Sequence, residues 1–195
     1  MLIASTTSGE LPVPARRPIV PNGVLGMIVF VCTSAMLFAG LISAYSVVRA
    51  TSPVGWPPLD QPRLPVESTA FNTAALVASG VLLAIAAARF PRSSAAARGP
   101  MLASIVLGAV FVVLQGAEWV ALLAQGLTLT SSTLGSFFYL IIGAHALHAM
   151  AGIAAMAVTV PKRIRRGKTG GQAVALYWLF VVALWPILYF LVYLS

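Results

Sequence analysis

Charged residues are scarce in this chain of 195 residues: only 8% are charged, and four of those are acidic. A soluble domain carries about 25% charged residues, so this chain has too little charge to cover a water-exposed surface. The mean hydropathy of +0.95 agrees with that view. The composition therefore argues against a free cytosolic enzyme. It also argues against nucleic-acid binding, because the cations behind the net charge of +8 lie in short connectors between apolar runs.

Cysteine and histidine are rare as well. The single cysteine, Cys32, lies in an apolar run, so no disulfide within the chain and no cysteine-based metal cluster can form. Residues 1–22 lack the apolar core of about 7–15 residues that a secretory signal needs. Their prolines prevent a regular helix, so we expect a retained, extended or disordered tail, with Asn22 as the N-cap of the first helix.

Long apolar runs make up most of the remaining chain. A helix needs roughly 20 residues to cross about 30 Å of hydrocarbon, and lipid-exposed backbone must satisfy its own hydrogen bonds. Five runs qualify, at about 24–48, 70–88, 101–124, 134–160 and 173–194. The sequence therefore predicts an all-α, polytopic integral membrane protein whose domain, residues 23–195, is a bundle of five transmembrane helices.

The connectors predict the orientation of the bundle. Ten of the 12 Lys and Arg residues lie on one side: Arg16, Arg17, Arg89, Arg92, Arg98, Lys162, Arg163, Arg165, Arg166 and Lys168. Only Arg49 and Arg63 lie on the other side. Because cytoplasmic loops are enriched in Lys and Arg, we expect a cytoplasmic N-terminus and a periplasmic C-terminus. The outer connector around Trp56 is rich in proline and should form an ordered loop on the bundle or on a partner.

The spans contain few ionisable side chains. Glu118 lies in the third span, and His145 and His148 share one face of the fourth. Such groups are expected to face the bundle and find partners. Gln115 shares the face of Glu118, whereas Trp119 points elsewhere, and the short connector predicts that the third and fourth helices meet. Glycines in the spans indicate close helix packing.

Three hypotheses compete for Glu118, His145 and His148. Haem or metal ligation is disfavoured, because two histidines on one helix make a poor axial pair and a dinuclear site needs more carboxylates. A proton relay is disfavoured because three groups do not cross the bilayer. A structural polar cluster, which ties helices together or binds a lipid headgroup or partner, is favoured. We therefore assign no catalytic, cofactor-binding or metal-ligating residue to this chain.

Five motifs, in order along the chain, resemble subunit III of the haem-copper oxidases, the group of cytochrome c oxidases and quinol oxidases. They are MLFAGLISAY at 36–45, GWPP followed by FNTAALVASG at 55–58 and 71–80, LQGAEW at 114–119, GAHALHAMAG at 143–152 and YWLFVVALW at 177–185. The resemblance runs from about residue 23 to the end. It implies a five-helix form that lacks the first two helices of seven-helix members.

The resemblance implies a non-catalytic subunit of a respiratory terminal oxidase in the bacterial inner membrane. Haem and copper would lie in partner subunits, with subunit I as the main contact, subunit II and others nearby, and cytochrome c as the expected electron donor. The chain would stabilise the catalytic subunit and hold phospholipid. The implied structural, lipid or subunit contacts are Glu118, His145, His148, Gln115, Asn72, Trp56, Pro57, Trp119 and Trp185.

Three positions depart from the family pattern. Ser34, Leu179 and Val182 stand where the resemblance implies ionisable side chains, so a proton-related role is not expected here. The departures leave open a relative associated with nitric oxide reductase. From another class, an independent small membrane transporter also remains open, although it would need a polar path across the whole bundle.

Overall fold

The computed structural model describes residues 21–53, 56–58, 61–89, 93–166 and 171–194. Within these ranges it is all-helical, and five of its helices are long and apolar enough to cross a membrane, as predicted. They are α1 (Asn22–Ala50), α2 (Val66–Arg89), α3 (Ser94–Ala124), α4 (Thr133–Arg166) and α5 (Gln172–Leu188), which a π-helix continues from Tyr189 to Tyr193. Residues 1–20 of the predicted tail lie outside the described residues.

The helix ends differ from the predicted ones for local reasons. Asn22 is not an N-cap: it is the first residue of α1, and the carbonyl of Pro21 accepts the backbone N–H groups of Val24 and Leu25 at 2.8 and 3.1 Å. The third helix starts earlier than predicted because the Ser93 side chain caps it by accepting the N–H of Ala96 at 3.2 Å. The helix then continues through Pro100.

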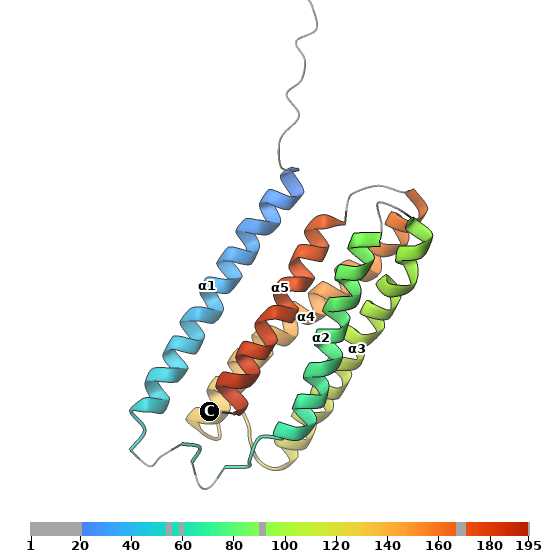
Figure 1. Ribbon diagram of the computed structural model, residues 1–195. Helices are drawn as coiled ribbons and strands as arrows, with labels where there is room; N and C mark the ends of the chain where they lie inside the picture. Colours follow the sequence, from blue (N-terminus) through green and yellow to red (C-terminus); the bar gives the residue numbers. More distant parts are fainter. Residues whose placement is uncertain (1–20, 54–55, 59–60, 90–92, 167–170, 195) are drawn as a thin grey trace, which may run out of the picture.

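The helices form an elongated bundle in which α5 lies between α1 and the other helices (Figure 1). α2 and α3 pack along each other, and α5 contacts α1, α2 and α4. The start of α1 lies at the same end as the end of α2 and the start of α5, whereas the connectors from α1 to α2 and from α3 to α4 lie at the opposite end (Figure 1). This alternation is what the predicted spans require.

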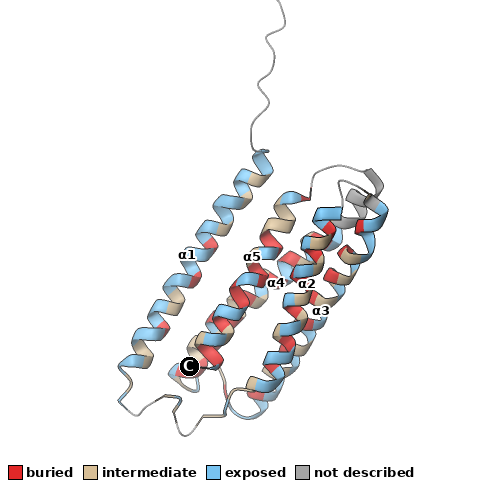
Figure 2. Cartoon of the chain, viewed as in Figure 1, coloured by how far each residue is buried: buried red, intermediate tan, exposed pale blue. Residues whose placement is uncertain are grey.

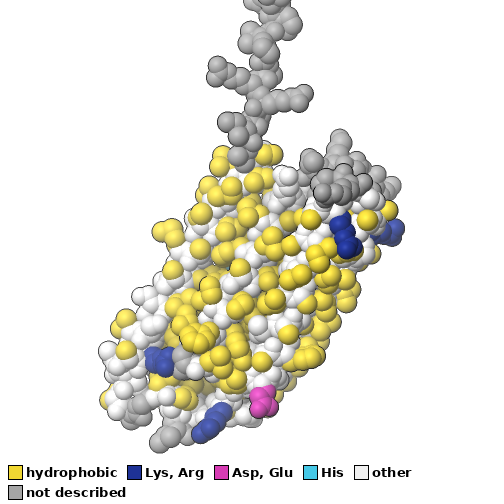
Figure 3. Space-filling model, viewed as in Figure 1, with side chains coloured by type: hydrophobic (Ala, Val, Ile, Leu, Met, Phe, Trp, Pro, Cys, Tyr) yellow, Lys and Arg dark blue, Asp and Glu magenta, His cyan; other side chains and the backbone are white. Residues whose placement is uncertain are grey.

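Burial is concentrated around α5 and is low on α1 (Figure 2). Of the 29 residues of α1, only Ser34, Phe38 and Tyr45 are buried. The centre of the bundle is aromatic, with fully buried Phe38, Phe111, Phe138, Trp178 and Trp185. Outward, hydrophobic side chains cover the middle of the visible face, and the described charged side chains lie toward its ends (Figure 3). Such a surface suits a bilayer and would be an aggregation hazard in water.

Three of the glycines are necessary for close packing. A Cβ atom at Gly108 of α3 would lie 2.7 Å from Trp178, and one at Gly152 of α4 would also lie 2.7 Å from that ring. A Cβ atom at Gly80 of α2 would lie 2.8 Å from Val182. At these three positions the prediction of close packing through glycine is confirmed. At Gly26, Gly40 and Gly116, by contrast, nothing lies within 4 Å.

Candidate functional site

The Glu118 carboxylate sits in a hydrogen-bonded network toward the C-terminal end of α3 and the start of α2. Its Oε1 accepts the Asn72 side-chain amide at 2.9 Å, and its Oε2 accepts the Thr69 hydroxyl at 2.8 Å and the Gln115 amide at 3.0 Å. Thr69, Asn72 and Gln115 are buried. The expected partner for Glu118 therefore exists, but it comes from α2 and not from α4, because α2 and α3 form the most extensive helix pair.

Gln115 extends this network to the C-terminal π-helix. Its Nε2 also lies 3.1 Å from the hydroxyl of Tyr193, so the two amide hydrogens serve Glu118 and Tyr193. Glu118 and Gln115 together thereby join α2, α3 and the π-helix. Thr69 and Tyr193 were missed by the sequence reasoning. Thr69 precedes Asn72 by three residues, which puts both on one helix face, and this spacing was a usable signal.

His148 ties α4 to α1. Its Nδ1 lies 2.7 Å from the carbonyl oxygen of Ala144, and since a carbonyl only accepts, Nδ1 donates. In the neutral ring Nε2 then accepts the Ser34 hydroxyl, at 3.3 Å. The ring also packs edge-on against Phe38, with centroids 5.4 Å apart. Tyr177 of α5 donates to the His148 carbonyl at 3.0 Å, so α5 joins the same junction.

His145 does not share the hydrogen bonds of His148 or Glu118. It is 1% exposed, and neither ring nitrogen has a hydrogen-bond partner among the described residues. Its ring lies 4.9 Å from that of Trp185 and 6.3 Å from that of Phe111. The single polar cluster expected from the sequence is therefore two separate networks, with His145 in an aromatic environment between them.

The three tryptophans proposed as contact residues each contact another helix or connector within the bundle. Trp56 donates from Nε1 to the hydroxyl of Tyr45 at 3.1 Å, which holds the connector between α1 and α2 on α1, and Pro57 lies beside it. Trp185 donates to the hydroxyl of Thr73 at 2.8 Å and links α5 to α2. Trp119 packs edge-on against Tyr139 of α4, with centroids 5.7 Å apart.

A third junction was not predicted. Trp178 of α5 donates to the Ser79 hydroxyl of α2 at 3.0 Å, and Ser79 in turn lies 2.7 Å from the carbonyl oxygen of Ser104 on α3. All three side chains are fully buried. In an apolar sequence, serines among alanines resemble small residues with no specific role. Only the packing shows that Ser79 and Ser104 link helices.

Metal ligands do not gather in the described part of the chain. No group of three or more His, Cys, Asp or Glu side chains there could hold a metal ion. What the arrangement does chemically is to join helices: each junction spans at least two helices, and its donors and acceptors are neutral side chains, backbone carbonyls or the single Glu118 carboxylate.

Comparison with known proteins identifies the family. Residues 13–195 match the family model for cytochrome c oxidase subunit III. The chain belongs to this family. It is 32% identical to a probable cytochrome c oxidase subunit 3 from Nocardia farcinica, covering 89% of this chain and 88% of that protein. A probable cytochrome c oxidase subunit 3 from Mycobacterium leprae is 31% identical with the same coverage.

Relatives outside the bacteria are longer than the matched region. Cytochrome c oxidase subunit 3 of Pelomedusa subrufa is 31% identical over 91% of this chain and 72% of its own length. Membership of the cytochrome c oxidase subunit III family confirms the resemblance on which the sequence analysis relied. This multi-pass membrane protein is thus a subunit of a respiratory oxidase complex, which decides against the independent transporter.

The three departures from the subunit III pattern occupy different environments. Ser34 is buried and bonded to His148, so it takes part in a junction. Val182 is buried against Gly80. Leu179 is 38% exposed on the outside of α5.

Proposed function

We propose that this chain is the non-catalytic, stabilising subunit III of a haem-copper terminal oxidase in a bacterial inner membrane. Subunit I is its main contact, with subunit II and other oxidase subunits nearby, and those partners carry the haem and copper. Cytochrome c donates the electrons for oxygen reduction, and the chain itself holds phospholipid. Its N-terminus faces the cytoplasm and its C-terminus the periplasm.

The observation that carries this proposal is the way the intramembrane polar side chains are used. Glu118 hydrogen-bonds Thr69 and Asn72 across the α2–α3 interface, and His148 contacts Ser34 across the α4–α1 interface. Leaving a buried donor or acceptor unpaired costs about 1–3 kcal/mol. These contacts therefore favour one arrangement of the helices, and a fixed arrangement is what a bracing subunit must offer its neighbour.

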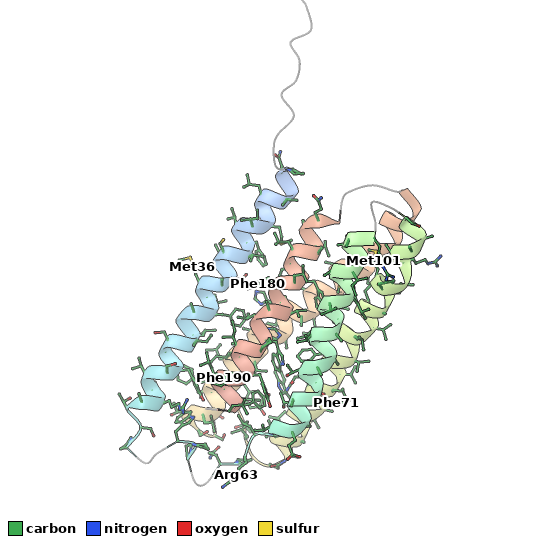
Figure 4. All side chains as sticks on the ribbon, viewed as in Figure 1. Met36, Arg63, Phe71, Met101, Phe180 and Phe190 are labelled. Atoms are coloured by element: carbon green, nitrogen blue, oxygen red, sulfur yellow. The ribbon has the colours of Figure 1, made fainter. Side chains whose placement is uncertain are left out.

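The α1 helix supports a partner contact. It packs on α5 and α4 only along a narrow strip, and Met36 projects away from the bundle (Figure 4). A groove of about 310 Å³ between α1 and α5 is lined by small and apolar side chains, among them Ala35, Ala39 and Ala183. Small residues let a further helix approach closely in a membrane.

Phospholipid has a candidate place at the outer end of α2 and α3. A cavity of about 550 Å³ there is lined by Arg63, Ser68, Phe71 and Glu118, among others. Arg63 lies where the connector enters α2, and Phe71 projects from the outer side of that helix (Figure 4). A guanidinium above an apolar wall suits a lipid phosphate with its acyl chain below.

The test combines assembly with turnover. We expect Glu118→Ala with His148→Ala to weaken retention of this chain in the purified oxidase and to shorten the time over which turnover continues. The initial rate of oxygen reduction should stay near that of the wild type. Glu67→Ala is the matched control, because Glu67 is an exposed glutamate on α2.

Immediate loss of the initial rate in an intact double-variant complex would contradict the bracing role. Haem or copper bound by this chain alone would contradict it as well. A co-purifying assembly that reduces nitric oxide and not oxygen would instead support the relative associated with nitric oxide reductase.

A further inference from the structure

Two cavities lie on either side of the chain where it enters α2. The first, of about 550 Å³, runs between α2 and α3 and is the candidate place for phospholipid. The second, of about 500 Å³, is walled by the connector between α1 and α2, the start of α4 and the end of the π-helix. We call them the helix cavity and the connector cavity. Of the residues that line them, only Arg63 borders both.

The chain that enters α2 separates the two cavities. Arg63 and Pro65 line the helix cavity, whereas Pro62, Leu64 and Val66 line the connector cavity. Residues 62–65 are not helical, and this alternation is what a nearly extended chain gives. Because Arg63 borders the connector cavity as well, a ligand held by its side chain can have one part in each cavity.

The Arg63 guanidinium is free to bind a ligand. The side chain is exposed, and it forms no hydrogen bond or ion pair with another described residue. Arg63 stands three residues before Val66, where the apolar span of α2 begins, so it lies at the level of the membrane surface and not of the hydrocarbon. A guanidinium at this level can pair with a phosphate through two parallel hydrogen bonds.

The walls of the two cavities suit different parts of a lipid. Further along α2 and α3 the helix cavity is bordered by Phe71, Leu114 and Ala121, which make an apolar wall for an acyl chain. Figure 4 shows Arg63 on the connector and Phe71 further along α2. The wall of the connector cavity is more polar and lies beside the connector, where a headgroup would meet water.

We propose that one anionic phospholipid with an uncharged headgroup, of the phosphatidylglycerol kind, occupies both cavities. Its phosphate pairs with Arg63, an acyl chain lies along the helix cavity, and the headgroup enters the connector cavity. The inference rests on the proposed function, in which the chain holds phospholipid, and it adds the place of the headgroup and the charge of the lipid.

The charges around Arg63 select this class of lipid. No acidic side chain among the described residues lines the connector cavity, and the exposed Glu67 of α2 borders neither cavity. Glu118 borders the helix cavity, but it lies six residues before the end of α3, about 9 Å along the helix, and already accepts three side-chain hydrogen bonds. The ammonium of a zwitterionic lipid would therefore lie near a guanidinium without an acidic partner, and an uncharged headgroup avoids that repulsion.

The test uses the whole purified oxidase in nanodiscs that contain equal amounts of phosphatidylglycerol and phosphatidylethanolamine with the same acyl chains. Native mass spectrometry counts the lipids that each complex retains, and a cryo-electron microscopy map locates them. We expect lipid density that reaches from Arg63 into both cavities. Arg63→Gln should lose this lipid, and the lipid lost should be phosphatidylglycerol in preference to phosphatidylethanolamine by about fivefold. Arg49→Gln removes a cation that lines neither cavity and should keep the lipid.

A second pair of variants tests the acyl chain. Ala121→Trp places a large ring in the helix cavity and should displace the lipid. Val120→Trp is the matched control, because Val120 is 67% exposed and lines neither cavity. Both changes lie on exposed positions of α3, so the fold should tolerate them.

The results that overturn this inference differ from those that overturn the proposed function. Unchanged lipid in Arg63→Gln, density confined to the helix cavity, or equal loss of the two lipids would each overturn the inference and leave phospholipid holding intact. A map in which this chain retains no phospholipid would overturn both. The bracing role is read separately, from retention of the chain and the duration of turnover in the same samples.

Discussion

The Trp178 ring is held between two glycines, and adding one methyl group tests how tightly. Its side chain is fully buried, Gly108 of α3 and Gly152 of α4 lie against it, and its Nε1 is bonded to Ser79. In Gly108→Ala the new Cβ would lie 2.7 and 2.9 Å from two ring carbons. The ring cannot shift away without pressing on Gly152 or breaking its hydrogen bond.

The expected magnitude follows from two opposing effects. Overpacking a filled core costs about 1–3 kcal/mol, toward the upper part of that range where the neighbour is fixed. Alanine recovers up to about 1 kcal/mol through its higher helix propensity. The net expectation for Gly108→Ala is a destabilisation of about 1–2 kcal/mol. Gly116→Ala, on the same helix with nothing within 4 Å of its Cβ, should be neutral or slightly stabilising.

Thermal or denaturant unfolding of the purified oxidase, followed by the fraction of this chain that stays bound, measures the effect. Trp178→Phe removes the ring atoms that the new methyl group meets, so Gly108→Ala should be less harmful in that background than in the wild type. Equal stability of Gly108→Ala and Gly116→Ala would refute the argument that Trp178 is clamped.

The remaining predictions concern the hydrogen-bonded junctions and the orientation. Asn72→Leu removes one hydrogen-bond partner of Glu118 and should lower the free energy of unfolding by about 1–3 kcal/mol. Asn72→Asp sets two carboxylates side by side and should destabilise the protein more than Asn72→Leu does. Equal stability of the two variants in the same unfolding assay would contradict this. Trp185→Phe loses the hydrogen bond to Thr73 and should lower the free energy of unfolding by about 0.5–1.5 kcal/mol. In a double-mutant cycle, Thr73→Val should destabilise the Trp185→Phe variant less than it destabilises the wild type. In a Cys32→Ser background, a membrane-impermeant thiol reagent should label Thr130→Cys from outside intact spheroplasts and Arg98→Cys only after lysis; the reverse pattern would invert the proposed orientation.

Much of the architecture follows from the sequence because the bilayer imposes it. Runs of about 20 apolar residues have few alternatives to a spanning helix. Four of the predicted spans lie within observed helices, and the fifth, predicted to end at residue 194, overruns the observed helical stretch by one residue. The ends were less predictable. Ser93 caps α3 earlier than expected, and α4 continues to Arg166, because water-exposed turns at a helix end are decided by local hydrogen bonds and not by hydropathy.

The polar residues of the candidate site could be predicted from the sequence, but their hydrogen-bond partners could not. Glu118, Asn72, Gln115 and His148 all form the kind of bond expected for polar groups in a membrane. The sequence grouped Glu118 with His145 and His148, whereas in the structure the hydrogen bonds of Glu118 go to Thr69, Asn72 and Gln115. A short connector shows that α3 and α4 are neighbours, but it does not show that α2 covers the face of α3 that carries Glu118.

The sequence by itself determined the five spans, the all-helical class and, through its ordered motifs, the cytochrome c oxidase subunit III family. Only the tertiary structure decided which helices each polar side chain joins and that Trp178 lies between two glycines. Hydropathy is a property of each segment and is read along the chain. The rotation of a helix about its axis is set instead by the shapes of all its neighbours together, so contacts such as Glu118 with Thr69 emerge only when the bundle is packed.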